Sequence, residues 1–177
     1  MLDLSSAEWS HLRASAGGDG RLTAHLLTKL AGGDTDEWAE LHHQVCHQNT
    51  VGEVAYVAAP HMVEIARGAS PYIRAQLLST LGAIEASRKT WPEHAPTIRA
   101  EWQVEYERAC ENARALAADG LRHRGEQVET FLLLGALAGL HGHADLAMLL
   151  QLGPDLSCPV CGDPIEFRES LPPAADC

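Results

Sequence analysis

Apolar residues at helical spacing constrain the fold of this chain more than any other feature of its sequence. From Val54 to Ile65, apolar or small residues recur every three or four positions, which places them on one face of a helix. A second helix is predicted to start at Ser70-Pro71, because serine is a good N-cap and proline suits the first helical position. Its apolar face consists of Ile73, Leu77, Leu81 and Ile84. Two such helices joined by a short turn pack side by side.

The same pattern continues through most of the chain. We predict a first pair of helices at about residues 5–16 and 21–31, and a long amphipathic helix from about Ile98 to Gly120. Between them, Asp34 is expected to cap a helix that has Glu37 three residues on and Trp38, Leu41 and Val45 on its inner face. Residues 128–140 are apolar on nearly every side, so we expect them to form the central, most buried helix. No strand hairpin is predicted ahead of the C-terminal segment, because β-branched runs are scarce and only 5% of the residues are aromatic.

These helices predict an all-α protein, arranged as an α/α superhelix of antiparallel helix pairs with a short C-terminal tail. The chain has 177 residues, 46% of them hydrophobic, which is enough to bury a substantial core within one domain. After Gly153-Pro154 the composition changes to proline, acidic residues and two close cysteines. We therefore expect a helical domain over residues 1–153 and a separate tail over residues 154–177.

Acidic side chains outnumber basic ones by 24 to 13, which gives a formal net charge of -11. Proteins that bind nucleic acid concentrate lysine and arginine on one surface, so this balance argues against a nucleic-acid partner. An acidic surface attracts cationic proteins instead and speeds their association. The alternative interpretation is that the charge only keeps the protein soluble.

No segment is apolar for long enough to predict a membrane span. The longest apolar run, Phe131–Leu140, is about half of the roughly 20 residues that cross a bilayer as a helix. The N-terminal residues lack a basic stretch followed by an apolar one, which argues against a secretory signal. These features favour a cytoplasmic protein with no membrane partner.

The sharpest local motif is Cys158-Pro159-Val160-Cys161, because two thiolates separated by two residues form half of a zinc ribbon. Cys158 and Cys161 are therefore the predicted ligands of a structural zinc ion. Cys177, a histidine of the helical domain or a second subunit would have to complete the four ligands. Free thiols and a redox pair are the alternatives.

The densest polar cluster in the sequence holds three histidines within six residues. On a helix, His43 and His47 share one face and His42 and Cys46 share the adjacent face, so either pair could supply two metal ligands. Gln44 stands where a metallopeptidase needs a glutamate base, which argues against hydrolytic zinc chemistry.

This cluster also has interpretations without a metal. In the structural one, His47 and Gln48 end the helix, and their side chains bond to its last carbonyl groups or to the turn at residues 49–52. In the other, the same residues belong to a binding surface.

Other distinctive residues have structural interpretations. His61 lies on an apolar helical face and is expected to be a hydrogen-bonded core histidine, while Pro60 should kink that helix or mark its true start. We expect His141-Gly142-His143 to form a loop between helices rather than a ligand pair. Cys46 and Cys110 fall within helical patterns and are predicted to be buried.

One stretch of the chain resembles a known group of proteins. It runs from Trp38 through Val45-Cys46-His47-Gln48-Asn49-Thr50-Val51 and Ala58-Ala59-Pro60-His61-Met62 to about Ser87. The stretch is similar to a segment of small bacterial HEAT-repeat-like proteins. In these a tryptophan-containing helix ends in a His-Gln-Gly-Thr-Val-Tyr-like turn, and the next helix carries an Ala-Ala-x-Pro-like sequence. Asn49 replaces the usual glycine of that turn, and Gly52 replaces the usual aromatic residue.

The resemblance implies a curved stack of helix pairs that presents one face to another protein, and such folds occur among bacterial immunity proteins that neutralise toxins. Fold alone does not fix function. The charge agrees with the implication, because an acidic protein would attract a cationic nuclease or deaminase toxin. We therefore predict a non-catalytic protein-binding module, an immunity or inhibitory protein whose partner is a cationic toxin.

The predicted binding face combines aromatic anchors with polar side chains. Its residues are Trp38, His42, His47, Gln48, Tyr56 and His61. Two other functions are alternatives. A metal-dependent enzyme would build a histidine-rich centre from His42, His43 or His47 together with His61 or His94. A scaffold protein would only mediate oligomerisation.

Overall fold

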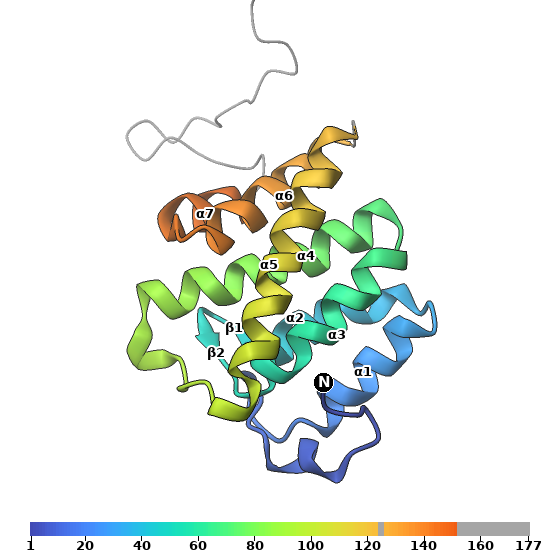
Figure 1. The fold of residues 1–177 in the computed structure, drawn as a ribbon, viewed down its shortest axis with the longest axis vertical. Helices are drawn as coiled ribbons and strands as arrows, with labels where there is room; N and C mark the ends of the chain where they lie inside the picture. The colour runs from blue at the N-terminus through green and yellow to red at the C-terminus, as the bar shows by residue number, and fades with distance from the viewer. Residues whose placement is uncertain (124–125, 152–177) are drawn as a thin grey trace, which may run out of the picture.

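The structure is a computed structural model that describes residues 1–123 and 126–151. Over these residues the predicted all-α class is confirmed, since the chain forms α-helices joined by short turns, three short 3-10 helices (η) and one small hairpin (Figure 1). The elements in chain order are η1 (Ala7–His11), α1 (Arg21–Ala31), η2 (Thr35–Glu37), α2 (Trp38–Val45), β1 (Cys46–His47), β2 (Thr50–Val51), α3 (Val54–Gly68), α4 (Pro71–Thr90), η3 (Pro92–His94), α5 (Ala100–Arg122), α6 (Gln127–Leu140) and α7 (Ala144–Gln151). The predicted tail over residues 154–177 lies outside the described residues.

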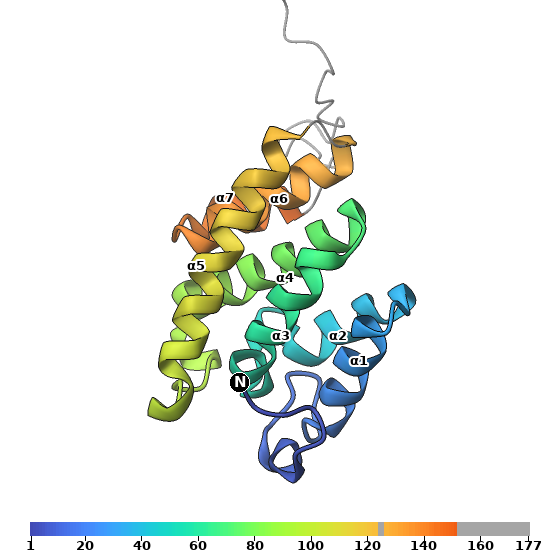
Figure 2. The same ribbon diagram turned by 45° about the vertical axis from the view of Figure 1, so that its right-hand side comes forward.

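The helices pack as three pairs in chain order. α1 packs on α2, α3 on α4, and α5 on α6. Between the pairs, α3 contacts both α1 and α5, and α4 contacts both α2 and α6, so the pairs stack along the long axis of the molecule (Figures 1 and 2). α7 turns back against α6 and α4 at the end of the stack opposite α1. Short connections favour this order, because they leave each helix close to its neighbours in the chain.

α4 is the most buried helix of the described chain. Every residue from Ala75 to Ser87 is buried, because helices α2, α3, α5, α6 and α7 all pack around α4. The prediction that residues 128–140 form the most buried helix is therefore wrong. These residues form most of α6, which lies near the end of the stack and leaves Leu134 40% exposed.

The contact between α4 and α6 is a contact between backbones. A β-carbon added at Gly82 would lie 2.6 Å from the Cα of Ala136, and one added at Gly139 would collide with the carbonyl oxygen of Gly82. Protein interiors are close-packed, so neither position can take a side chain unless the two helices move apart. The two glycines therefore let α6 approach α4 closely enough to cover its apolar surface.

The prediction of a helix at residues 5–16 is wrong. Only η1 forms there, and two glycines at positive φ follow it. Besides local turn bonds, the backbone of this segment bonds to other elements. The N–H of Arg13 donates to the Glu53 carboxylate at 3.2 Å, and the N–H of Ser15 donates to the Gln44 carbonyl at 2.7 Å. These bonds hold the segment against α2 and the start of α3, in place of helical hydrogen bonds.

A hairpin that we did not predict follows α2. His47 pairs with Thr50, and the two residues between them, Gln48 and Asn49, have φ values of 47° and 64°. Two left-handed residues in succession form the type I′ turn that suits a two-residue hairpin, and asparagine tolerates this conformation well. The helix consequently ends at Val45, so the interpretation in which His47 and Gln48 end the helix is wrong.

The starts of α4 and α3 both agree with the helical patterns of the sequence. Ser70 caps α4, with its hydroxyl accepting the N–H of Ile73 at 3.5 Å, and Pro71 occupies the first helical position. α3 begins at Val54 and contains Pro60 in its interior. The alternative in which Pro60 marks the true start of the helix is therefore wrong.

Replacing Gly82 with alanine should destabilise the protein by a net ~1–3 kcal/mol, because the added methyl group overpacks the contact between α4 and α6. Urea denaturation followed by circular dichroism measures the change. Gly68→Ala is the matched control, since a β-carbon at Gly68 meets no atom within 4 Å. This control should be as stable as the wild type or more so, because alanine favours a helix over glycine. If both variants had the stability of the wild type, the backbone contact would be refuted.

Candidate functional site

The six predicted binding residues lie on two stretches of the chain and differ in burial. Four lie on α2 and on the hairpin that follows it: Trp38, His42, His47 and Gln48. The other two, Tyr56 and His61, are buried on α3. The prediction of a single cluster is therefore corrected. Tyr56 and His61 follow the hairpin, which redirects the chain, and α3 turns both side chains toward other partners.

Tyr56 belongs to a buried polar network that the sequence pattern does not indicate. Its hydroxyl donates to the Pro96 carbonyl at 2.7 Å, and its ring meets the Tyr106 ring edge to face with centroids 5.1 Å apart. Tyr106 donates to the buried carboxylate of Glu85 at 2.7 Å, and Arg88 pairs with that carboxylate while lying 5.4 Å from both tyrosine rings. Burial raises the pKa of both phenols. The network joins α3, α4 and α5 and is structural.

His61 is a hydrogen-bonded core histidine, as predicted. Its side chain is buried, and Nε2 lies 2.8 Å from the carbonyl oxygen of Leu2. A carbonyl only accepts, so Nε2 carries the proton and donates. Burial lowers the pKa of His61, which keeps the imidazole neutral at pH 7. The ring also lies against Trp9, with centroids 6.1 Å apart.

His42 is held by α4. Its Nδ1 lies 2.9 Å from the Thr80 hydroxyl oxygen, and this hydroxyl in turn donates to the Gln76 carbonyl. The single hydroxyl proton is thus in use, so Nδ1 of His42 is the donor. Burial lowers the pKa of His42, and the neighbouring His43 and His47 lower it further.

His43 and His47 lie in contact, with ring centroids 3.9 Å apart. Within residues 1–123 and 126–151, however, no group of three histidine, cysteine, aspartate or glutamate side chains is placed to hold a metal ion. His61 faces the N-terminal segment, and His94 is an exposed residue of η3. The described residues therefore do not assemble the histidine-rich centre that a metal-dependent enzyme would need.

Trp38 has an aromatic partner that the sequence does not indicate. Tyr72, in the first turn of α4, meets the Trp38 ring edge to face with centroids 6.4 Å apart. Trp38 is half-buried against the core, while Tyr72 is 43% exposed. The packing of α2 on α4 creates this pair, and the local sequence around Tyr72 shows only the capping pattern of a helix start.

A depression of about 470 Å³ lies near this aromatic pair, between the end of α1, η2 and the turn that joins α3 to α4. Its apolar lining residues include Leu30, Ile65 and Ile73. Thr35 also lines it, between Asp34 and Asp36 in the chain. The depression therefore has an apolar floor, with Glu64 as the acidic residue of its lining and Asp34 and Asp36 next to Thr35 in the chain.

Acidic side chains continue from Asp34 and Asp36 along the start of α2. Asp34, Asp36 and Glu40 are exposed, and Glu37 is half-buried. Lys29 pairs with Glu37 and lies 3.8 Å from Asp34, so its ammonium group engages two of these four carboxylates. We define the acidic-aromatic face as the depression together with Asp34, Asp36, Trp38, Glu40 and Tyr72.

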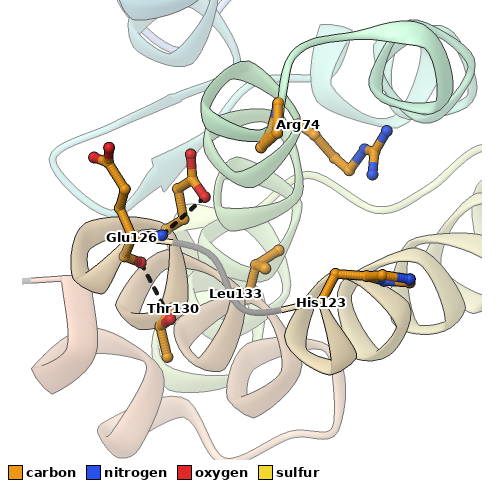
Figure 3. A pocket seen from close by; sticks show the side chains of 8 residues that line it. Arg74, His123, Glu126, Thr130 and Leu133 are labelled. Atoms are coloured by element: carbon orange, nitrogen blue, oxygen red, sulfur yellow. Dashed lines mark hydrogen bonds between the residues drawn. The ribbon is translucent and has the colours of Figure 1, made fainter.

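A second pocket, of about 300 Å³, lies where the start of α4 meets the end of α5 and the first half of α6 (Figure 3). Its polar groups serve helix ends. Arg74 donates to the carbonyls of Ala66 and Arg67 at the end of α3, at 3.0 and 3.4 Å. The Glu129 carboxylate accepts the N–H of Glu126 at 3.3 Å within a capping box. These side chains fix the positions of α3 and α6 and leave the acidic-aromatic face as the better candidate site.

The two cysteines among the described residues are buried, as predicted. Burial raises the pKa of the Cys46 thiol and raises that of Cys110 to about 12. Both therefore stay protonated at neutral pH, whereas nucleophiles and metal ligands must be thiolates. The predicted zinc ligands Cys158 and Cys161 lie outside the described residues.

Comparison with known proteins does not assign this chain to a family. A scan of protein-family models and searches of curated proteins and of solved structures gave no match to this chain. Among the described residues, no helix has the length and apolar character needed to cross a bilayer.

Stability should fall as the pH drops below about 6.5, the ordinary histidine value, because the folded state lowers the pKa of His42 and His61. Below this pH the unfolded chain binds protons at these histidines more strongly than the folded protein does. The free energy of unfolding therefore falls by at most about 1.4 kcal/mol per pH unit for each histidine. Urea denaturation between pH 7.5 and 5.5 measures this slope.

The variant His42→Asn/His61→Gln keeps an N–H donor near each original position and removes the titration, so its slope should be shallower than that of the wild type. His25→Asn, on the exposed side of α1, is the control and should keep the original slope. A double variant with the slope of the wild type would show that these histidines do not set the pH dependence.

Proposed function

We propose that this protein is a non-catalytic module that binds a cationic protein, and that it acts as an immunity or inhibitory protein against a toxin. The observation that carries the proposal is the acidic-aromatic face, where an apolar depression, an aromatic pair and exposed carboxylates lie together. Protein interfaces combine these elements, with apolar and aromatic anchors at the centre and charged groups at the rim.

The aromatic pair supplies the anchor. Tyr72 exposes part of a rigid ring whose position is already fixed by Trp38, so a partner that buries it loses little side-chain entropy. The depression beside it has room for an apolar side chain of the partner. Contacts of this kind supply most of the binding energy at protein interfaces.

The carboxylates supply selectivity and speed. Asp36 and Glu40 are exposed and lie two residues before and two residues after Trp38 in the chain, while Lys29 is already engaged by Glu37. Such a field repels acidic proteins and steers cationic ones, for which association becomes faster at low ionic strength. A toxin that acts on nucleic acid needs a basic surface, and an acidic inhibitor can cover that surface.

The packing supports the finer fold assignment, a HEAT-like α/α superhelix. Each helix pair packs chiefly on the next pair in the chain, which is the arrangement of a helical solenoid. The acidic-aromatic face lies at the junction of the first two pairs, where α1, α3 and the starts of α2 and α4 meet. The predicted binding residues His42, on α2, and His47 and Gln48, in the hairpin that follows α2, stay predicted members of the interface.

Site-specific photocrosslinking tests the proposal in cells of the source organism. The photoreactive amino acid p-benzoylphenylalanine replaces Tyr72 in one variant and Val104 in another. Val104 is 72% exposed on α5 and serves as the control position. We expect position 72 to trap a protein rich in lysine and arginine, and position 104 not to trap it. Equal trapping at both positions, trapping of an acidic protein, or crosslinks only between copies of this chain would contradict the proposal.

Charge reversal tests the electrostatic part of the proposal, using the partner that photocrosslinking at position 72 identifies. Asp36→Lys/Glu40→Lys should slow association by about tenfold or more at low salt, and added salt should shrink the difference. Glu107→Lys/Glu111→Lys is the matched control, because it makes the same change in net charge on the exposed side of α5. Stopped-flow fluorescence measures the association rates. An equal effect of both variants would show that overall charge, and not this face, attracts the partner.

A further inference from the structure

The outer side of the last two helices is apolar and open to solvent. A groove of about 540 Å³ lies between α6 and α7. Its lining residues are Leu134, Leu137, Ala138, His141, His143, Leu146 and Leu150. Leu146 is 48% exposed on α7, and Leu134 is 40% exposed on α6. The end of a helical stack is normally polar, so an apolar end indicates that another molecule covers it.

The lining residues follow the spacing by which helices pack on one another. Residues 134, 137, 138 and 141 line the groove from α6 and the turn after it, and residues 143, 146 and 150 line it from the start of α7 onward. Side chains three, four and seven positions apart lie on one face of a helix. Two neighbouring helices that turn such faces to the same side form half of a four-helix bundle. The pattern therefore favours a second helix pair as the occupant of the groove.

The charge of this end favours a second copy of the chain over a cationic protein. The whole chain has a net charge of -11, but residues 130–151 contain one carboxylate, that of Asp145, and no lysine or arginine. Two acidic molecules repel each other least where their surfaces carry few charges. A cationic protein, by contrast, finds few carboxylates to pair with at this end.

Two charged groups of opposite sign border the groove. Asp145 is exposed and directly precedes the lining residue Leu146. Lys89, at the end of α4, is also exposed, and its Nζ would lie 2.7 Å from a β-carbon added at Gly142 in the turn between α6 and α7. Within residues 1–123 and 126–151, neither group has an ion-pair partner. In a contact with two-fold symmetry such a patch is complementary to itself, because each group meets its opposite on the other copy.

We propose that two copies of this chain associate through the groove between α6 and α7 with two-fold symmetry. Helix α7 of each copy packs in the groove of the other copy and buries Leu146, so that the two helix pairs form a four-helix bundle. Lys89 of each copy pairs with Asp145 of the other copy at the rim. The dimer continues the packing of the stack, in which each helix pair covers the next. The acidic-aromatic face, near α1 at the other end, stays open in both copies.

Sedimentation velocity of the full chain tests the apolar part of the contact. We expect the wild type to form a dimer that dissociates on dilution. Leu146→Glu should raise the dissociation constant by about a hundredfold or more, because the two-fold contact buries the added charge twice. Leu22→Glu is the matched control, since Leu22 is a leucine on α1 that is 43% exposed, and it should leave the dissociation constant unchanged. Circular dichroism verifies that both variants keep their helices.

Two results of this experiment would overturn the proposal. One is a wild type that stays monomeric at every concentration. The other is a dimer that Leu146→Glu weakens no more than Leu22→Glu does.

Exchange of charges tests the symmetry of the contact. Lys89→Glu and Asp145→Lys each place like charges at both rim contacts, so each variant alone should dimerise about tenfold more weakly than the wild type or worse. An equimolar mixture of the two variants should regain the association of the wild type, because a mixed dimer has opposite charges at both contacts. A mixture that sediments like the separate variants would refute the two-fold contact. These measurements involve no partner of the acidic-aromatic face, so their outcome is independent of the proposed function.

Discussion

The close approach of α4 and α6 is the contact on which the rest of the structure depends. Gly82 and Gly139 remove the side chains that would keep these helices apart, so α4 is enclosed by helices from both neighbouring pairs. An enclosed α4 in turn provides fixed positions for its surroundings. It holds Tyr72 against Trp38, Thr80 against His42, and the buried carboxylate of Glu85 against Tyr106. The candidate site is thus positioned by a helix that is buried from Ala75 to Ser87 and exposed at its start.

The sequence predicts those features that depend on local patterns. Ser70-Pro71 marks the start of α4 because capping involves only neighbouring residues, and the apolar position of His61 identifies it as a core histidine. Features that depend on distant contacts are not predictable in this way. Residues 128–140 are more apolar than α4, yet the position of α6 near the end of the stack leaves it more exposed. The Trp38–Tyr72 pair likewise exists only because α2 packs on the start of α4.

The proposed binding face lies at one end of the stack, near α1, and offers an anchor and a negative field to a cationic protein. At the other end of the stack, α6 and α7 form a groove that is lined chiefly by apolar residues and by His141 and His143. The two ends of the described stack thus differ in chemistry.

Hydrogen–deuterium exchange of the complex with the cationic partner is the most direct test of the central claim. The account predicts slower exchange in η2, in the first turn of α2 and in the first turn of α4, with no change along the exposed side of α5. Protection confined to α5, or to the hairpin alone, would contradict it and would place the binding surface elsewhere on the stack.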